Sequence, residues 1–345
     1  MKRFLLQDST NYTDSEYQDY ILQGVSRTFA LTIPQLPKQL ESVVGNAYLW
    51  CRIADTIEDD PHLALALKVS FSDQLTQLLV GHGSADDWAC ELLPQLDNDT
   101  AAAELDLIAN SQRMMRLFVS FKPSQQAIIQ QCVATMVQGM MHYQSHQPHA
   151  GLPNLQALND YCYHVAGIVG EMLTLLYCDY CSKVRQHQEL LMPLAVSFGQ
   201  GLQMTNILKD IWQDQSRGIC WLPQDVFSRH NIELQDLPSQ RTDVAFQQGV
   251  TELVAIAHTH LRDAMRYTLM LPSSEQGYRN FCLWAIGMAM LTLKNIHRRP
   301  DFEHSSQIKI SRSKVKIILV VTRLIGRSNM LVRLFFKRLA RGLPV

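Results

Sequence analysis

Gly199 to Pro223 reads GQGLQMTNILKDIWQDQSRGICWLP, and within it Asn206, Asp210 and Asp214 are spaced four residues apart. This spacing places the three side chains on one face of an α-helix. The other positions are largely apolar, and bare carboxylates are costly to bury among apolar side chains. Because Mg²⁺ takes oxygen ligands, the stretch predicts a helix with either a metal-binding face or a solvated acidic stripe.

A second acidic stretch occupies residues 48–60, YLWCRIADTIEDD, after a mostly apolar run. Asp55, Glu58 and Asp59 again share one helical face. Pro61 suits a helix end, where the helix dipole disfavours carboxylates, so a structural role explains this cluster poorly. Two acidic helical faces far apart in the chain therefore predict a site at which several Mg²⁺ ions hold a diphosphate.

Charge is distributed unevenly along the chain. It has 345 residues, 47% hydrophobic and 18% charged, as expected of a globular protein with a large core. Residues 304–345 hold ten Lys and Arg and no acidic residue, whereas residues 1–303 hold 21 basic and 32 acidic residues, a net charge of −11. This asymmetry predicts an anionic partner or a membrane surface, and we expect no nucleic-acid partner.

No segment predicts export or a membrane span. The N-terminal MKRFLLQDST has too short an apolar run for a signal peptide, and no stretch reaches about 18 uninterrupted apolar residues. The eight cysteines lie mostly among apolar neighbours, as buried free thiols do. We therefore expect a cytoplasmic protein, either free or peripheral on the cytoplasmic face of the membrane.

Apolar positions recur every three or four residues over most of the chain, and period-two alternation is almost absent. This pattern predicts an all-α fold. Helices are expected in residues 62–80, in 104–145 with a break at Lys122–Pro123, in 155–185, after Pro193, in 243–270 and in 274–298. Gly167 and Gly170 predict either a close helix approach or room for a ligand.

With both acidic stretches in place, the chain resembles the squalene/phytoene synthase family of head-to-head prenyl transferases over about residues 20–315. DTIEDD is similar to the first aspartate-rich motif of that family, and NILKDIWQD followed by RGICWLP is similar to the second. SRTFA at 26–30 and YCYHVAGIVG at 161–170 are further signatures in the family's order. The resemblance implies one isoprenoid-synthase domain in residues 1–315, a helical bundle around a deep central cavity. Residues 316–345 would then form the last helix and a basic amphipathic tail.

The resemblance also implies a reaction between two molecules of a prenyl diphosphate, here farnesyl diphosphate, and the residues that carry it out. The expected metal ligands are Asp55, Glu58, Asp59, Asn206, Asp210 and Asp214, whose four aspartates are also expected to be catalytic. The expected substrate-binding residues are Ser26, Arg27, Phe29, Tyr48, Arg52, Gln203, Asn206, Lys209, Arg217 and Phe281. Tyr161 is implied as a catalytic residue that relays a proton or stabilises a cation. Lys209 departs from the arginine common in the squalene-forming branch and lacks its planar fork.

The squalene-forming branch is the most similar part of the family, in DTIEDD and in residues 278–314. KISRSK at 309–314 resembles a basic motif of that branch associated with NADPH, although Ser313 replaces a glycine. Lys309, Arg312 and Lys314 are therefore the expected cofactor-binding residues. The branch condenses two farnesyl diphosphates to presqualene diphosphate with Mg²⁺ and reduces this product to squalene with NADPH.

Alternatives stay open for the activity and for the tail. A family member that makes dehydrosqualene or phytoene, or that stops at presqualene diphosphate, would need no NADPH. A non-catalytic, membrane-associated helical protein would have acidic faces that are only solvated. In the tail, apolar and basic residues alternate from Val315 to Leu343, which predicts a last core helix and then a segment that lies on an anionic membrane or packs on the domain. The sequence leaves the substrate chain length and the oligomeric state open.

Overall fold

The computed structural model describes residues 11–26, 28–145, 150–237 and 241–344. In these ranges the chain is helical and has no strand beyond an isolated bridge between Leu152 and Pro223, so the predicted all-α class is confirmed. Contacts divide the chain into two compact units, Met1–Ser145 with Leu175–Arg185 and His146–Thr174 with Gln186–Val345. The structure describes each unit by itself, so the single bundle with a central cavity stays a prediction.

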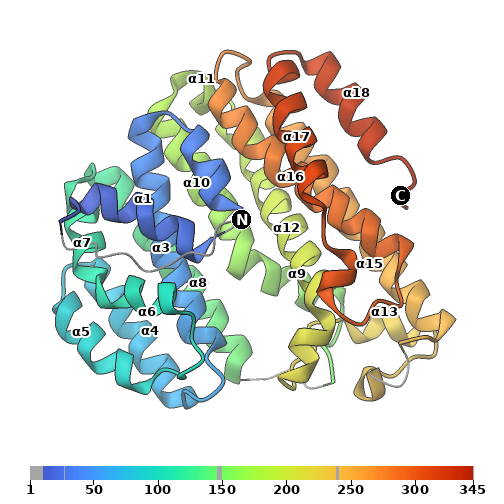
Figure 1. Ribbon diagram of the computed structural model, residues 1–345, viewed down its shortest axis with the longest axis horizontal. Coiled ribbons are helices and arrows are strands. Elements are labelled where there is room, and N and C mark those ends of the chain that lie inside the picture. The colour runs from blue at the N-terminus through green and yellow to red at the C-terminus, as the bar shows by residue number, and fades with distance from the viewer. Residues whose placement is uncertain (1–10, 27, 146–149, 238–240, 345) are drawn as a thin grey trace. The chain divides into compact units, whose positions relative to one another are not determined.

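The first unit is organised around the long helix α3, which packs against α1, α4 and α8 (Figure 1). Its helices are α1 (Asp14–Val25), α2 (Phe29–Thr32), α3 (Lys38–Asp59), α4 (Leu65–Leu79), α5 (Ala85–Leu92), α6 (Ala102–Ala109), α7 (Ser111–Ser120), α8 (Pro123–Ser145) and α11 (Ser182–Arg185). Trp50, Ile53 and Ile57 are fully buried on α3, which leaves its acidic residues on the remaining faces. The predicted break at Lys122–Pro123 separates α7 from α8.

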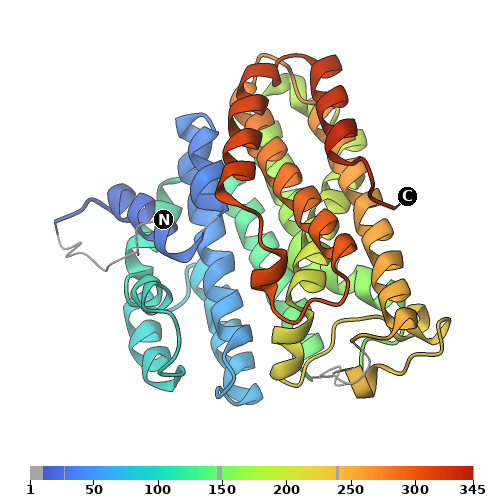
Figure 2. The same ribbon diagram turned by 45° about the vertical axis from the view of Figure 1, so that its right-hand side comes forward.

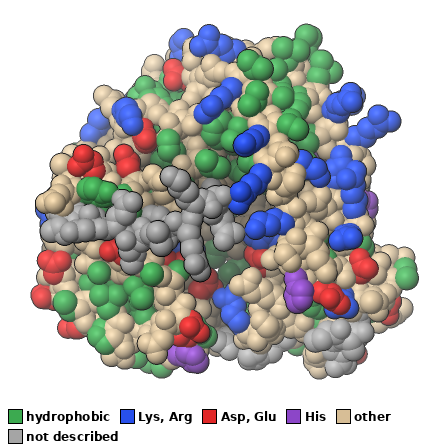
Figure 3. Space-filling model, viewed as in Figure 1, with side chains coloured by type: hydrophobic (Ala, Val, Ile, Leu, Met, Phe, Trp, Pro, Cys, Tyr) green, Lys and Arg blue, Asp and Glu red, His purple; other side chains and the backbone are tan. Residues whose placement is uncertain are grey.

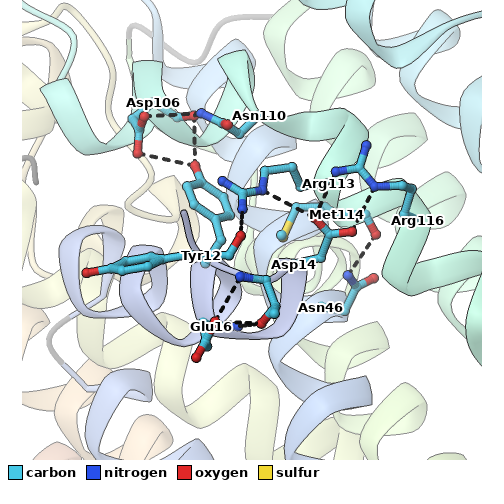
Figure 4. Close-up of polar contacts among 11 residues, drawn as sticks. Tyr12, Asp14, Glu16, Asn46, Asp106, Asn110, Arg113, Met114 and Arg116 are labelled. Atoms are coloured by element: carbon cyan, nitrogen blue, oxygen red, sulfur yellow. Dashed lines mark hydrogen bonds and ion pairs between the residues drawn. The ribbon is translucent and has the colours of Figure 1, made fainter. Parts of the chain in front are cut away.

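Polar contacts fix α1 and α3 against α7 (Figure 4). The carboxylate of Asp14 pairs with the guanidinium groups of Arg113, at 3.2 Å, and Arg116, at 2.8 Å. Asn46 on α3 donates a hydrogen bond from Nδ2 to the carbonyl of Met114, at 3.0 Å. These contacts hold the segment after α1, which carries the SRTFA motif, on the same framework as α3.

In the second unit α12, α15 and α16 lie side by side, and α17 and α18 pack on α16 (Figures 1 and 2). Its helices are α9 (Leu155–Cys162), a π-helical turn (Tyr163–Gly167), α10 (Ile168–Tyr180), whose last residues belong to the first unit, α12 (Gln188–Ser216), α13 (Gln224–Ser228), α15 (Val244–Met270), α16 (Gln276–Arg298), α17 (Arg312–Ile325) and α18 (Asn329–Leu339). The predicted boundary between residues 315 and 316 lies inside α17.

Two predicted helix boundaries in this unit were wrong. The helix expected after Pro193 already begins at Gln188, because a proline in the second turn removes one backbone hydrogen bond without ending the helix. The single helix expected over residues 155–185 is interrupted by the π-helical turn and ends at Tyr180. Such turns accommodate an extra residue and are frequent at functional sites.

Glycines let α12 approach the segment from the π-helical turn to α10 very closely. A Cβ on Gly199 would lie 2.1 Å from the carbonyl oxygen of Ala166, and one on Gly170 would lie 2.1 Å from that of Ala195. No larger residue fits at either position unless the backbones move apart. Of the two predicted roles for Gly170, the close helix approach is therefore confirmed.

The tail packs on the second unit through a minority of its side chains. Ile318 and Thr322 of α17 are buried, as are Val332 and Phe336 of α18. The indole of Trp284 on α16 donates a hydrogen bond to the hydroxyl of Thr322, at 2.8 Å. None of the described helices combines the length and the apolar composition needed to cross a membrane.

Candidate active site

The three predicted metal ligands of α3 occupy its last two turns, and Glu58 is the most buried of them. Its side chain is 6% exposed, and its Oε1 atom is buried without a hydrogen-bond partner. The pKa of Glu58 is raised to about 8, mainly by burial and also by the nearby carboxylates of Asp59 and Asp55, against the opposing hydrogen bond from Gln144 and the charge of Lys68. A buried carboxylate oxygen that lacks a donor is a position that suits a bound cation.

Asp55 lies one turn before Asp59 beside a pair of opposite charges. The pKa of Asp55 is raised to about 7, mainly by burial and also by Asp59 and Glu104, whereas the Arg52 guanidinium, 3.8 Å away, opposes the shift. The Asp55 side chain is nevertheless 37% exposed, so water screens part of the effect of burial on its pKa. The pKa shift of Asp55 therefore changes the free energy of unfolding less than that of Glu58 does. Arg52 also forms an ion pair with Glu104 of α6. Sequence reasoning missed Glu104, because no local motif links it to α3.

Three of the predicted substrate-binding residues meet at the start of α2. The hydroxyl of Ser26 accepts a hydrogen bond from the backbone N–H of Phe29, at 2.9 Å, and the Phe29 and Tyr48 rings lie 4.9 Å apart between centroids. Burial raises the pKa of Tyr48 to about 12, so its phenol stays protonated. Ser26, Phe29 and Tyr48 thus combine hydroxyl groups with an aromatic surface, and Arg27 lies outside the described residues.

On the acidic face of α12, each aspartate lies within 3.0 Å of a cation from the same helix or its end. Lys209 places its Nζ 3.0 Å from Oδ2 of Asp210 and 3.4 Å from Oδ1 of Asn206. Arg217 lies 2.9 Å from Oδ1 of Asp214. The predicted helix is confirmed, and its geometry places the three acidic-face residues together with their two basic neighbours.

Tyr161 is held by the segment that follows α12. Its ring stacks on Trp221 with 3.9 Å between centroids and 9° between planes. The backbone N–H of Leu152 donates to the carbonyl of Leu222, at 2.9 Å, and that of Gln224 to the carbonyl of Leu152, at 2.8 Å. Trp221 was not predicted as a site residue from the sequence. It lies in the RGICWLP motif, and this position was the signal that could have identified it.

The other two substrate-binding predictions in this unit differ in burial. Gln203 is half-buried on α12, close in sequence to Asn206. Phe281 is only 4% exposed on α16, as a core residue would be. A contact of either residue with substrate stays a prediction.

The three predicted cofactor-binding residues surround the N-terminus of α17, and all three are exposed. Ser311 caps this helix by accepting a hydrogen bond from the backbone N–H of Lys314, at 3.4 Å. Burial lowers the pKa of Lys294 on α16, and the positive charges of Arg298 and Lys314 lower it further. Lys294 and Arg298 therefore join the predicted group, although neither was expected from the sequence.

The predicted metal ligands are divided between the two units. Asp55, Glu58 and Asp59 belong to the first unit, and Asn206, Asp210 and Asp214 belong to the second. In the part of the chain that the structure describes, no group of three or more His, Cys, Asp or Glu side chains is arranged to hold a metal ion. A metal site built from both sets of ligands therefore stays a prediction.

Comparison with known proteins identifies relatives over nearly the whole chain. The sequence profile of the squalene/phytoene synthase family matches residues 22–314. Squalene synthase ERG9 of Candida albicans is 29% identical over 313 residues, which are 88% of this chain and 66% of that protein. The squalene synthase of Cyberlindnera jadinii is 25% identical over 321 residues, 92% of this chain and 70% of that one. The chain thus spans about two thirds of the length of these relatives.

A solved structure shows the same fold. TcSQS, in its complex with the ligand BPH1237, aligns with a TM-score of 0.76 at 21% identity and covers 96% of this chain and 93% of its own. The predicted all-helical architecture is therefore shared with this solved structure.

Proposed function

Because this chain belongs to the squalene/phytoene synthase family of prenyltransferases, we propose that it is a squalene synthase. It would join two farnesyl diphosphates head to head into presqualene diphosphate and reduce that product to squalene with NADPH. The observation that carries this proposal is the pair of acidic helical faces on α3 and α12, each accompanied by basic or hydroxyl groups suited to phosphate oxygens. The relatives named squalene synthase favour this product over dehydrosqualene or phytoene.

The α3 side would bind cations and one end of a diphosphate. Glu58 has a buried carboxylate oxygen without a donor, so this side fits the predicted Mg²⁺ ions. Asp55, Glu58 and Asp59 would hold the ions, which when bound neutralise the charge that develops on the departing diphosphate. Arg52, which Glu104 orients, would donate to phosphate oxygens beside them.

The α12 side would bind metal ions and diphosphate as well. Asp210 and Asp214 would serve as metal ligands, with Asn206 beside them on the same face. Lys209 and Arg217, which these aspartates already hold in place, would turn to the phosphates. Each basic side chain would then move from an aspartate to a phosphate oxygen, and the aspartate would pair with a metal ion. Little charge is left unpaired in this arrangement.

Aromatic groups would protect the carbocation that remains after diphosphate departs. The stacked rings of Tyr161 and Trp221 offer a π-face to a cation, and the Tyr161 phenol can hold or pass on a proton. Phe29 and Tyr48 would form another part of the wall and keep water away.

The basic group at the N-terminus of α17 would bind the phosphates of NADPH, which when bound supplies a hydride. Lys309, Arg312 and Lys314 are exposed there beside the positive end of the helix dipole, and Lys294 and Arg298 add positive charge. These side chains fit an anionic cofactor.

The decisive experiment is product analysis of the purified full chain with farnesyl diphosphate and Mg²⁺, with and without NADPH. We expect squalene with NADPH, and presqualene diphosphate with some dehydrosqualene without it. If the products are the same in both cases, the protein is instead a dehydrosqualene, phytoene or presqualene diphosphate synthase. If no farnesyl diphosphate is consumed, the catalytic proposal fails.

A double variant tests the cofactor site separately. Arg312→Ala with Lys314→Ala should raise the NADPH concentration for half-maximal squalene formation about tenfold, as expected for the loss of charged contacts to phosphate. The rate of presqualene diphosphate formation should stay unchanged. Lys337→Ala with Arg338→Ala on α18 removes the same charge elsewhere and serves as the control. An unchanged NADPH requirement in the first variant would contradict this site.

A further inference from the structure

Helix α17 has an exposed apolar stripe. Ile317, Val320 and Leu324 are 57%, 56% and 79% exposed, respectively. Their spacing places them on one side of the helix, opposite the buried Ile318 and Thr322. The sequence predicted a core helix here, yet three of its large apolar side chains are exposed to solvent.

Helix α18 repeats this arrangement. Met330, Leu331 and Leu334 are 66%, 43% and 58% exposed, while Val332 and Phe336 pack inward. We call these three residues and the three of α17 the α17–α18 face. Figure 3 shows hydrophobic side chains gathered over this part of the molecule, with Lys and Arg side chains around them. A soluble monomer rarely exposes a continuous apolar patch unless the patch binds a partner or a membrane.

Positive charge surrounds the α17–α18 face, and no negative charge accompanies it in the sequence. The basic residues on or beside it are Lys316, Arg323, Arg327, Arg333, Lys337, Arg338 and Arg341. No Asp or Glu occurs after Glu303. The face is therefore complementary to a surface that is both anionic and able to accept apolar side chains.

An apolar groove continues the face from α18 toward α12 and α15. It has a volume of about 680 Å³, and Arg333 and Arg266 stand at it together with Glu189. Most of the remaining lining is apolar and includes Leu190, which is 62% exposed, and Leu269. The groove combines an apolar floor with the guanidinium groups of Arg333 and of Arg266, which also pairs with Asp263 at 2.9 Å, and this chemistry suits one chain of an anionic lipid.

We propose that the α17–α18 face docks on the surface of an anionic phospholipid membrane, with the groove beside α18 receiving an acyl chain. The apolar stripes of both helices would enter the headgroup region, and the basic side chains around them would pair with lipid phosphates. Both helices take part, whereas the sequence suggested only the last segment. The inference does not depend on the proposed activity, because the face alone carries it.

A second copy of the chain is a poor occupant of the same face. Pairing two such faces would bring two sets of basic residues together with no acidic residue after Glu303 to balance them. The lipid phosphates of an anionic bilayer supply the missing negative charge and its hydrocarbon covers the apolar stripes. The positive charge of the α17–α18 face therefore favours binding to an anionic membrane over pairing of two copies.

Flotation of the full-length protein with vesicles tests the proposal. One set contains phosphatidylcholine alone, and the other contains phosphatidylcholine with about one third phosphatidylserine. We expect the protein to float with the anionic vesicles at low salt, and binding to fall when salt screens the charges. Failure to float, or equal flotation with both vesicle types, would overturn the proposal.

Point variants locate the contact better than a truncation would. Removal of α18 would uncover buried core, because Val332 and Phe336 pack inward and Lys294 donates to the carbonyl of Leu339, at 3.0 Å. Leu324→Gln with Leu334→Gln changes only exposed side chains and should reduce the bound fraction about fivefold. Leu65→Gln with Leu67→Gln, exposed by 41% and 38% on α4, is the matched control and should bind as the wild type does.

Charge is tested in the same assay. Lys316→Gln with Lys337→Gln should weaken binding to anionic vesicles, and Lys183→Gln with Arg262→Gln, a pair of exposed basic residues elsewhere, should not. If the α17–α18 variants float as well as the wild type, the contact lies elsewhere and the proposal is wrong. If the Leu324 and Leu334 variant instead splits a stable dimer measured by light scattering, the face is a protein interface. Retention on heparin without vesicle binding would assign the face to a different polyanion.

Discussion

The acidic faces of α3 and α12 look alike in sequence but differ in the burial and pairing of their carboxylates. On α3, Glu58 is buried with a carboxylate oxygen that has no hydrogen-bond partner, and burial raises its pKa to about 8. On α12, Asp210 and Asp214 form ion pairs with Lys209 and Arg217. Cations lie beside both faces, since Arg52 is 3.8 Å from Asp55 and the Lys68 ammonium donates to the backbone carbonyl of Glu58. The α3 face is distinguished by the buried Glu58 carboxylate, whereas the aspartates of α12 lie within 3.0 Å of their cations.

This difference implies that metal ions would bind to the two faces in different ways. A metal ion that binds at α3 must displace protons, because the burial of Glu58 favours its neutral form near neutral pH. A metal ion that binds at α12 must displace basic side chains, which then become available to phosphates. We therefore expect metal binding to depend on pH through α3 and substrate binding to depend on the basic residues of α12.

The largest expected effect is the loss of turnover when either face loses a metal ligand. Asp55→Asn and Asp210→Asn keep the shape of the side chain and remove its charge, so turnover should fall at least about a thousandfold, roughly 4 kcal/mol of transition-state stabilisation. Squalene formation from farnesyl diphosphate at several Mg²⁺ concentrations measures it. Asp73→Asn, an exposed aspartate on α4, is the control and should be fully active.

The two variants should remain folded, as their far-ultraviolet circular dichroism would show. Near-normal turnover of either variant at low Mg²⁺ would remove that residue from the metal site. If only one of the two faces proves sensitive, the two acidic faces do not share a ligand.

The next effect separates the two faces by stability. The folded-state pKa of Glu58, about 8, lies above its usual value of about 4.5, so the folded state loses stability as pH rises from about 4.5 to 8. Glu58→Gln cannot ionise, and in metal-free buffer it should be more stable than the wild type by about 2 kcal/mol at pH 8 and little different at pH 5. Thermal unfolding in the presence of a chelator at both pH values measures this difference.

Asp214→Asn is the matched variant on α12. It leaves Arg217 without its carboxylate, so it should not stabilise the protein at pH 8. A gain in stability for both variants, or for neither, would show that the contrast between the two faces is wrong. Added Mg²⁺ should cancel the advantage of Glu58→Gln, because the wild-type carboxylate then has a partner.

The smallest effect concerns Glu104, which pairs with Arg52 beside Asp55. In Glu104→Gln the Arg52 guanidinium should turn toward Asp55, already 3.8 Å away, and compete there with Mg²⁺. We expect the Mg²⁺ concentration for half-maximal activity to rise about fivefold, an effect of roughly 1 kcal/mol, with little change in the maximal rate. Glu91→Gln, exposed on α5, is the control, and an unchanged Mg²⁺ requirement would show that Glu104 has no part in the site.

Much of the local structure followed from the sequence, because helices depend on spacing that neighbouring residues set. The shared face of Asn206, Asp210 and Asp214 and the helix end at Pro61 were both predicted and are both present. The start of α12 was predicted wrongly, because proline is tolerated in an early turn when packing holds the helix together. The π-helical turn before α10 has no comparable sequence signal.

The sequence by itself determined the all-helical class, the family and the two acidic helical faces, since each is encoded by residues close together in the chain. Only the tertiary structure decided which charges have partners. Glu104 reaches Arg52 from another helix, Trp221 stacks on Tyr161 and Lys294 joins Lys314. It also decided that α17 and α18 keep apolar side chains in solvent. Burial and pairing between distant residues depend on how helices pack, and the periodicity of each helix does not predict that packing.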